Sequence, residues 1–153
     1  MYMNPYMKAA IEEAYEGINH GHGGPFGAVV VKDGRIIGKG HNMVIKELDP
    51  TMHGEIVAIK DACRRVNHFD LSGAELYTTA EPCPMCLGAI LWAGISKIYY
   101  GCDRMDTDKI GFRDDIFYKM MDGEHSYDLK QVGYEECEEL FKSYQAIENK
   151  VSY

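Results

Sequence analysis

Four residues of this chain combine side chains that bind a transition metal with one that can move protons: His53, Glu55, Cys83 and Cys86. An imidazole and two thiolates suit Zn²⁺, which prefers nitrogen and sulfur ligands in tetrahedral geometry. A structural zinc site usually has four protein ligands, whereas a catalytic site has three and leaves the fourth position to water. The sequence therefore predicts one catalytic zinc ion per chain, bound by His53, Cys83 and Cys86.

Glu55 follows the histidine by two positions and is the residue placed to handle protons. Zinc lowers the pKa of a bound water from about 15.7 to about 7, which makes hydroxide available at neutral pH. A carboxylate beside this water can take its proton and pass it to the substrate. We therefore expect Glu55 to act in catalysis without binding the metal.

Other interpretations of the cysteine pair remain open. A lone Cys-x-x-Cys is also typical of a redox pair or of half a structural zinc site. His53 and Glu55 upstream, with prolines on both sides of Cys83, favour the catalytic interpretation. A non-catalytic zinc-binding module is the alternative from another class, and the presence of Glu55 argues against it. The other histidines are interpreted as surface or packing residues and not as ligands: His20, His22, His41, His68 and His125.

The chain has 153 residues and a net charge of −8. This length predicts one domain over residues 1–153. Proteins that bind duplex DNA or structured RNA usually present a basic face, so the acidic balance argues against a nucleic-acid substrate. The five cysteines are not preceded by a secretion signal, which indicates a reducing, cytoplasmic setting. No apolar run reaches the roughly 18 residues of a membrane span, so no membrane association is expected.

Periodicity and turn residues predict the elements that position these side chains. The first half is expected to contain a helix beginning at Asn4-Pro5, strands 26–31 and 35–40 joined by a turn at Asp33-Gly34, and a helix near 51–66. The second half is expected to contain strands 76–79, 97–101 and 129–134, helices 84–92, 116–121 and 136–150, and a charged loop over 103–115. Helices alternating with strands after an antiparallel hairpin indicate an α/β layered sheet.

The chain resembles the cytidine deaminase superfamily, and more narrowly the guanine deaminases of bacteria. The wider resemblance is carried by His53-Gly54-Glu55 and by residues 81–89, Glu-Pro-Cys-Pro-Met-Cys-Leu-Gly-Ala. The narrower resemblance extends over nearly the whole chain and is carried by residues 23–28, Asn42, residues 49–51, residues 111–115, Tyr118-Lys119, Asn149-Lys150 and Tyr153. One departure is Gly54, which stands where the family usually has alanine.

This resemblance implies a three-layer α/β/α sandwich around a five-stranded mixed sheet. It also implies hydrolysis of guanine at C2 to xanthine and ammonia, in a homodimer that exchanges its C-terminal segments. The implied roles are zinc binding by His53, Cys83 and Cys86, proton transfer by Glu55, contact with the amino group and assistance in proton transfer by Asp114, hydrogen bonding to the purine by Asn42, stacking by Phe26, and capping of the partner's pocket by Tyr153.

Related activities share the zinc motif and stay open as alternatives. Guanosine, cytosine and the adenosine of a tRNA are the other candidate substrates. The tRNA enzymes typically carry a segment rich in glycine and alanine, with basic residues, after the last core strand, whereas residues 102–108 here are acidic. The resemblance therefore favours a free purine base as the substrate.

Overall fold

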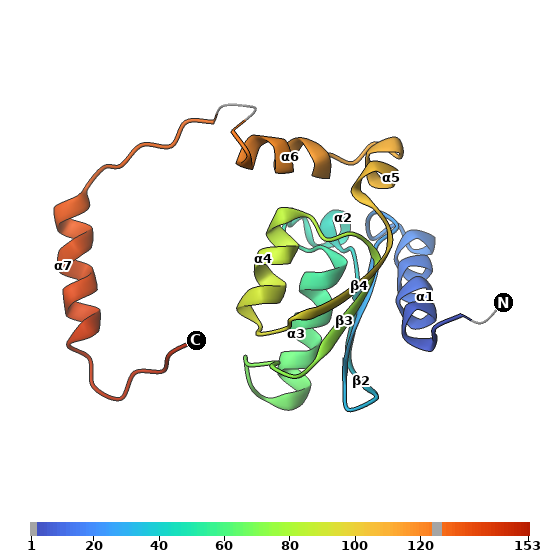
Figure 1. Ribbon diagram of the computed structural model, residues 1–153, viewed down its shortest axis with the longest axis horizontal. Coiled ribbons are helices and arrows are strands. Elements are labelled where there is room, and N and C mark those ends of the chain that lie inside the picture. The colour runs from blue at the N-terminus through green and yellow to red at the C-terminus, as the bar shows by residue number, and fades with distance from the viewer. Residues whose placement is uncertain (1–2, 124–126) are drawn as a thin grey trace.

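The computed structural model describes residues 3–123 and 127–153, and the elements are drawn in Figure 1. They follow one another in the order α1 (Pro5–Asn19), β1 (Gly27–Lys32), β2 (Arg35–His41), α2 (Val44–Glu47), α3 (Gly54–Val66), β3 (Glu75–Ala80), α4 (Pro84–Trp92), β4 (Lys97–Cys102), α5 (Arg104–Lys109), α6 (Asp114–Met121) and α7 (Tyr134–Gln145). No helix of the described residues is long and apolar enough to cross a membrane.

The sheet is mixed and has the strand order β2-β1-β3-β4. β1 pairs antiparallel with β2 and with β3, and β3 pairs parallel with β4. The turn between β1 and β2 places Asp33 at φ 51° and Gly34 at φ 75°. A tight hairpin turn needs this left-handed backbone at both central residues, so the Asp-Gly signal correctly predicted the hairpin.

Helices cover both faces of the sheet, which gives three layers (Figure 1). On one face, Val29 and Val31 of β1 pack with Ala10 of α1. On the other face, Val30 packs with Ala58 of α3, in a cluster that also includes residues of α4. Alternate residues of β1 therefore enter two separate cores, as the pleat of a central strand requires. The expected α/β/α arrangement is confirmed.

The α3 helix lies very close to β2 because two glycines of the strand leave room for it. A Cβ atom on Gly38 would lie 2.5 Å from the carbonyl oxygen of Ala58, and one on Gly40 would lie 2.6 Å from the Val57 side chain. Larger residues at these positions would push the helix outward. The close packing fixes the start of α3, where His53 and Glu55 lie, over the sheet.

The expected five-stranded sheet is wrong for the described residues, which form four strands. Residues 129–134 were expected to form the fifth, but residues 127–133 are irregular and lie away from β4 (Figure 1). Leu129 and Val132 are each 83% exposed. A strand is stabilised by pairing with a neighbour, and this segment has no sheet edge beside it in its own chain.

The charged loop expected over 103–115 contains the helix α5. Its start is stabilised by a capping box, in which the Asp103 side chain accepts from the Asp106 backbone N–H at 2.9 Å and the Asp106 side chain accepts from Asp103 at 3.0 Å. Two aspartates replace the usual Ser/Thr and Glu/Gln pair, which is why the signal was missed. α6 also begins two residues earlier than expected, at Asp114.

α7 lies away from the sheet and its helices (Figure 1). It ends at Gln145, five residues before the expected limit of 150. One side of it is apolar and open to solvent, with Leu140 64%, Phe141 68% and Tyr144 49% exposed. An amphipathic helix is stable when its apolar face is covered, so this face is available for a partner.

Candidate active site

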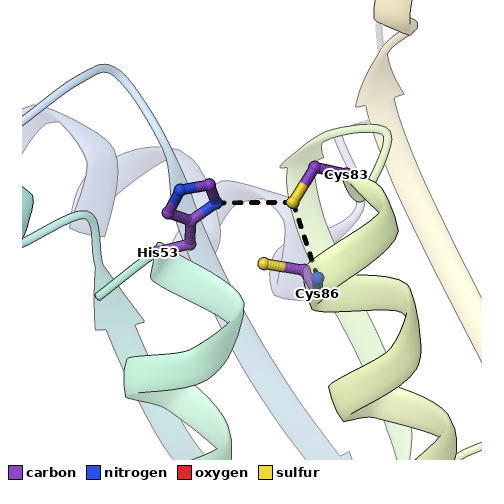
Figure 2. Close-up of side chains that lie close together, drawn as sticks. All are labelled: His53, Cys83 and Cys86. Carbon is purple, nitrogen blue, oxygen red and sulfur yellow. Dashed lines mark hydrogen bonds between the residues drawn. The ribbon is translucent and has the colours of Figure 1, made fainter. Parts of the chain in front are cut away.

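The three expected ligands converge between the starts of α3 and α4 (Figure 2). His53 is the N-cap of α3 and Cys83 is the N-cap of α4, both with extended backbone, while Cys86 lies within the first turn of α4. The ligand atoms of the three residues lie within 4.8 Å of one another. The sequence prediction that these residues come together is confirmed.

Their separation matches a tetrahedral zinc site. The Nδ1 atom of His53 lies 3.6 Å from the Sγ atom of Cys83. Tetrahedral bonds of about 2.1 Å to nitrogen and 2.3 Å to sulfur would place these two atoms about 3.6 Å apart. One nitrogen and two sulfur donors are also the ligand types that zinc prefers. Both the donors and their spacing therefore fit zinc.

The environment favours a thiolate at Cys83. Its pKa is lowered to about 4, first by the hydrogen bond with the Cys86 side chain and also by those with His53 and the Cys86 backbone. The pKa of Cys86 is raised, first by its hydrogen bond with the Cys83 side chain and then by burial. The hydrogen bond to Cys83 also raises the pKa of His53. A divalent cation would offset the repulsion between two thiolates, so metal binding must release protons.

Glu55 is buried beside these ligands and is only 5% exposed. Burial raises its pKa to about 7, with a smaller contribution from the negative charge of Cys83. A group with a pKa near the operating pH can both accept and donate a proton. Glu55 is outside the set of three residues placed to hold a metal in the described chain, as the sequence predicts.

A cavity of about 410 Å³ adjoins the cluster. Its volume is within the range of about 300–1,000 Å³ that is usual for small-molecule sites. Six of the eight predicted site residues line it, namely Phe26, Asn42, His53, Glu55, Cys83 and Asp114, whereas Cys86 and Tyr153 do not. A larger cavity of about 640 Å³ between α1, β4 and α5 shares Phe26 but has none of the metal ligands on its walls. The smaller cavity is therefore the candidate substrate site.

The predicted substrate-binding residues are held by the backbone around them. Asn42 is 4% exposed, its N–H donates to the Phe26 carbonyl at 2.9 Å, and its side-chain oxygen accepts from the Val44 N–H at 3.0 Å. The Phe26 ring meets Phe112 edge to face, with ring centroids 4.8 Å apart. Asp114 begins α6, and burial raises the pKa of its carboxyl.

Glycines allow the walls of the cavity to approach one another. A Cβ atom on Gly23 would lie 2.0 Å from Oδ1 of Asn42, and one on Gly24 would lie 2.7 Å from the Phe112 ring. A Cβ atom on Gly54 would lie 3.0 Å from the Phe26 carbonyl oxygen. Glycine at position 54 therefore avoids a tight contact between the start of α3 and the backbone of Phe26.

Several residues of the site were not predicted individually. Phe112, Arg113 and Glu81 also line the cavity. Arg104 connects the segment after β4 to this region, because its backbone N–H donates to Glu81 Oε1 at 3.2 Å. Residues 111–115 contributed to the resemblance, but only Asp114 was given a role. Phe112 and Arg113 flank it in sequence, which was the available signal.

Tyr153 is not on the walls of the cavity in its own chain. Its ring centroid lies 6.0 Å from those of Phe69 and Trp92. Trp92 is the last residue of α4, whereas Cys83 caps the opposite end of that helix. Tyr153 therefore lies far from the metal ligands of its own chain.

Known proteins similar in sequence and structure to this chain include zinc-binding deaminases. The family described as the cytidine and deoxycytidylate deaminase zinc-binding region matches residues 3–102. Guanine deaminase of Bacillus subtilis (strain 168) is 42% identical over 151 residues, which cover 97% of each protein. The X-ray structure of guanine deaminase from B. subtilis superposes with a TM-score of 0.91 over 99% of each chain.

Two further relatives match less of the chain. A tRNA-specific adenosine deaminase of Aquifex aeolicus (strain VF5) is 46% identical over 95 residues, or 62% of each protein. A guanine deaminase structure from Nitrosomonas europaea is 32% identical, with a TM-score of 0.67 over 73% of this chain and 66% of that one. The zinc cluster, the buried carboxyl and these matches together show that the chain belongs to the cytidine and deoxycytidylate deaminase zinc-binding family and is similar to bacterial guanine deaminase over almost its whole length.

Proposed function

We propose that this protein is a zinc-dependent guanine deaminase, which hydrolyses guanine at C2 to xanthine and ammonia. The observation that carries the proposal is the single cavity in which His53, Cys83 and Glu55 face the predicted purine-binding residues Asn42 and Asp114. Similarity to guanine deaminase over 97% of the chain supports the choice of purine.

His53, Cys83 and Cys86 would hold the zinc ion. When bound, zinc supplies a Lewis acid that makes a water molecule acidic at neutral pH. Glu55 takes one proton of the attacking water and gives it to the ring nitrogen next to C2, then takes the second proton of that water and gives it to the departing amine as the carbonyl forms. Its raised pKa, about 7, suits a residue that must carry a proton in both directions.

The other residues of the cavity recognise and orient the purine in this proposal. Phe26 stacks against the ring, and Asn42 provides hydrogen bonds to its polar edge. Asp114 contacts the amino group and assists its departure, and burial raises the pKa of its carboxyl, which favours the protonated form more than in an exposed aspartate. A site that hydrogen-bonds the amino group at C2 discriminates against purines that lack it.

The adenosine of a tRNA is the second candidate substrate, because a tRNA-specific adenosine deaminase is 46% identical over part of the chain. That match covers 62% of the chain, whereas the match to guanine deaminase covers 97%. The net charge of −8 also opposes binding of a phosphate backbone. These observations favour the free base.

The residues after α6 belong, in this proposal, to the site of a second copy in a homodimer. The exposed apolar face of α7 and the place of Tyr153 outside its own cavity support an exchange of C-terminal segments. Each chain would then be one catalytic domain over residues 1–153 whose last segment packs on its partner. The cysteines outside the metal site, Cys63, Cys102 and Cys137, form no disulfide, which supports a reducing compartment such as the cytoplasm.

A deamination assay with guanine, guanosine, adenine, cytosine and a tRNA anticodon stem-loop tests the function. Guanine should be consumed far faster than adenine or cytosine, by roughly 10⁴-fold or more, since unpaired polar groups in the site penalise the wrong base. Conversion of tRNA adenosine to inosine with guanine left intact would establish the second candidate instead.

A further inference from the structure

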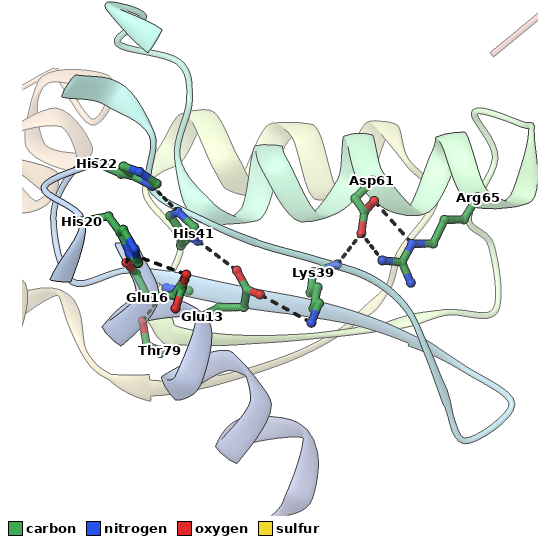
Figure 3. Close-up of polar contacts among 10 residues, drawn as sticks. Glu13, Glu16, His20, His22, Lys39, His41, Asp61, Arg65 and Thr79 are labelled. Carbon is green, nitrogen blue, oxygen red and sulfur yellow. Dashed lines mark hydrogen bonds and ion pairs between the residues drawn. The ribbon is translucent and has the colours of Figure 1, made fainter. Parts of the chain in front are cut away.

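Three side chains, from α1, the end of β2 and the turn after α1, form a hydrogen-bonded row (Figure 3). Oε2 of Glu13, on α1, lies 2.9 Å from Nδ1 of His41 at the end of β2, and Nε2 of His41 lies 2.8 Å from Nδ1 of His22. The Glu13 and His41 side chains are only 17% and 13% exposed. Water therefore competes weakly for these bonds. We refer to Glu13, His41 and His22 as the relay.

Tight packing holds His41 in this position. A Cβ atom on Gly17 of α1 would lie 2.7 Å from the His41 ring, so glycine leaves the space that the imidazole occupies. The His22 and His41 rings are stacked, with centroids 5.1 Å apart. Both ring nitrogens of His41 have partners, so a rotation of the ring would break two hydrogen bonds at once.

The relay joins the two segments that build one wall of the cavity. His41 is followed by Asn42 and His22 is followed by Gly23, and both following residues line the cavity. Gly23 lies against the Asn42 side chain, with no room for a Cβ atom. The His22 carbonyl also accepts from the N–H groups of Ile45 and Lys46 in α2. His22 and His41 do not line the cavity themselves, so they can act on substrate only through these neighbours.

We propose that Glu13, His41 and His22 are positioning residues for purine binding, which hold Asn42 against Gly23. The cavity wall formed by these two residues loosens when the imidazoles of His41 and His22 are both protonated. The inference rests on the proposed function, because it concerns the affinity of the same cavity for its purine.

The hydrogen bonds of the relay determine which of its ring nitrogens carry a proton. The Glu13 carboxylate accepts a hydrogen bond from Nδ1 of His41, so neutral His41 offers Nε2 as an acceptor to Nδ1–H of His22. One added proton preserves this bond, because either nitrogen of the facing pair can donate to the other. A second added proton places N–H groups on both facing nitrogens and two positive charges side by side, so the bond between the rings is lost.

The surroundings of the relay oppose protonation of His22. The pKa of His22 is lowered, first by partial burial and then by the positive charges of Lys46, His41 and His20, while Glu16 opposes the shift. Glu13 faces His41 from α1, and Lys39 of β2 lies 3.8 Å from the other carboxylate oxygen of Glu13. The wall is therefore intact at neutral pH and loosens as the pH falls.

Steady-state kinetics with guanine from about pH 8 to about pH 5 test the proposal, since histidine pairs titrate in this interval. The zinc-loaded wild type is compared with His41→Leu, which removes the relay, and with His41→Gln, which can still accept from His22 and donate to Glu13 but does not titrate. At neutral pH, His41→Leu should raise KM by up to about tenfold while kcat changes by less than about twofold. His41→Gln should restore KM at neutral pH and abolish its rise at acid pH.

His20→Gln is the matched control, because His20 is an exposed neighbour that bonds within α1 to Glu16 and not to the relay. It should keep the wild-type KM at neutral pH and still show the acid rise of KM, which can move only slightly upward in pH because the charge of His20 contributes to lowering the pKa of His22. Zinc content and melting temperature identify a variant that fails to fold. If His41→Leu fails to fold, His22→Leu takes its place and is judged by the same change in KM. This variant removes only the hydrogen bond between His22 and His41.

Two results would overturn the relay. One is an unchanged KM in the leucine variant, and the other is an acid rise of KM in His41→Gln that parallels the wild type. A wild-type enzyme inactive on guanine would instead refute the proposed function, and the affinity for xanthine measured by calorimetry would then test the relay separately. In that measurement, equal xanthine affinities of the wild type and His41→Leu would count against the relay.

Discussion

The hydroxyl of Tyr118 donates a hydrogen bond to the carbonyl oxygen of Pro82, at 2.5 Å. This bond joins α6 to the residue that directly precedes the metal ligand Cys83. Asp114 begins α6 and lies one helical turn before Tyr118, on the same side of the helix. The Arg104 guanidinium covers the Tyr118 ring at 4.5 Å from its centroid. The position of Asp114 relative to the metal site therefore depends on Tyr118.

Replacing Tyr118 by phenylalanine should lower the activity without removing the metal. Loss of one hydrogen bond costs about 0.5–1.5 kcal/mol, so kcat/KM for guanine should fall by about two- to tenfold while zinc content stays at the wild-type level. Kinetics and metal analysis measure the two quantities. Tyr15→Phe is the control, because the Tyr15 hydroxyl has no hydrogen-bond partner in the described part of the chain. Equal kinetics of the two variants would show that the bond to Pro82 does not support the site.

Cys83→Ala should lose zinc and stability together. Purified wild-type protein should contain about one equivalent of zinc per chain, and removal of one ligand should lower the melting temperature because metal binding also stabilises the fold. Metal analysis and thermal unfolding measure both effects. Cys102→Ala, which changes an exposed thiol outside the cluster, should retain the metal. Full zinc occupancy in Cys83→Ala would contradict the assigned ligand set.

Glu55→Gln should keep the metal and the fold but lose the residue that moves protons. General acid–base assistance typically raises a rate by roughly 10²–10⁴-fold, so kcat should fall by roughly 10²-fold or more. Xanthine binding and zinc content should remain near wild type, because the amide has nearly the same shape as the carboxyl. Turnover within about threefold of the wild type would remove Glu55 from the mechanism.

The metal site could be predicted from sequence because each of its two parts lies within a few consecutive residues at the start of one helix. Cys83 and Cys86 share one helix start, and a proline at the first helical position marks that start. Glu55 follows His53 in the same way at the start of α3. Asn42, which has no such local signal, was assigned a role through the resemblance alone.

Features that depend on distant partners were missed. The bonds of His41 reach 19 residues to His22 and 28 residues to Glu13, so no spacing rule connects them, and the histidines were interpreted as surface or packing residues. The strand expected over 129–134 also depended on a partner edge that its own chain does not place beside it. Sequence patterns record local preference, whereas both features are decided by which segments meet in the folded protein.

Removal of Tyr153 tests whether the C-terminal segment completes a partner's site. Terminal residues are usually tolerant of loss, so a segment without function would give a silent truncation. In the exchanged dimer, the truncated protein should keep its zinc content and melting temperature. Its activity on guanine should nevertheless fall sharply, because an uncapped pocket admits water and holds the purine loosely.

Mixing the truncated chain with the Glu55→Gln chain distinguishes exchange from a role within one chain. With exchange, one site of the heterodimer combines the intact Glu55 of the truncated chain with the intact tail of its partner, so activity should partly return. If Tyr153 acts only where it contacts Phe69 and Trp92 of its own chain, each site keeps its own defect and no activity returns. Native mass spectrometry of the mixture must show the heterodimer for the absence of recovery to count against exchange.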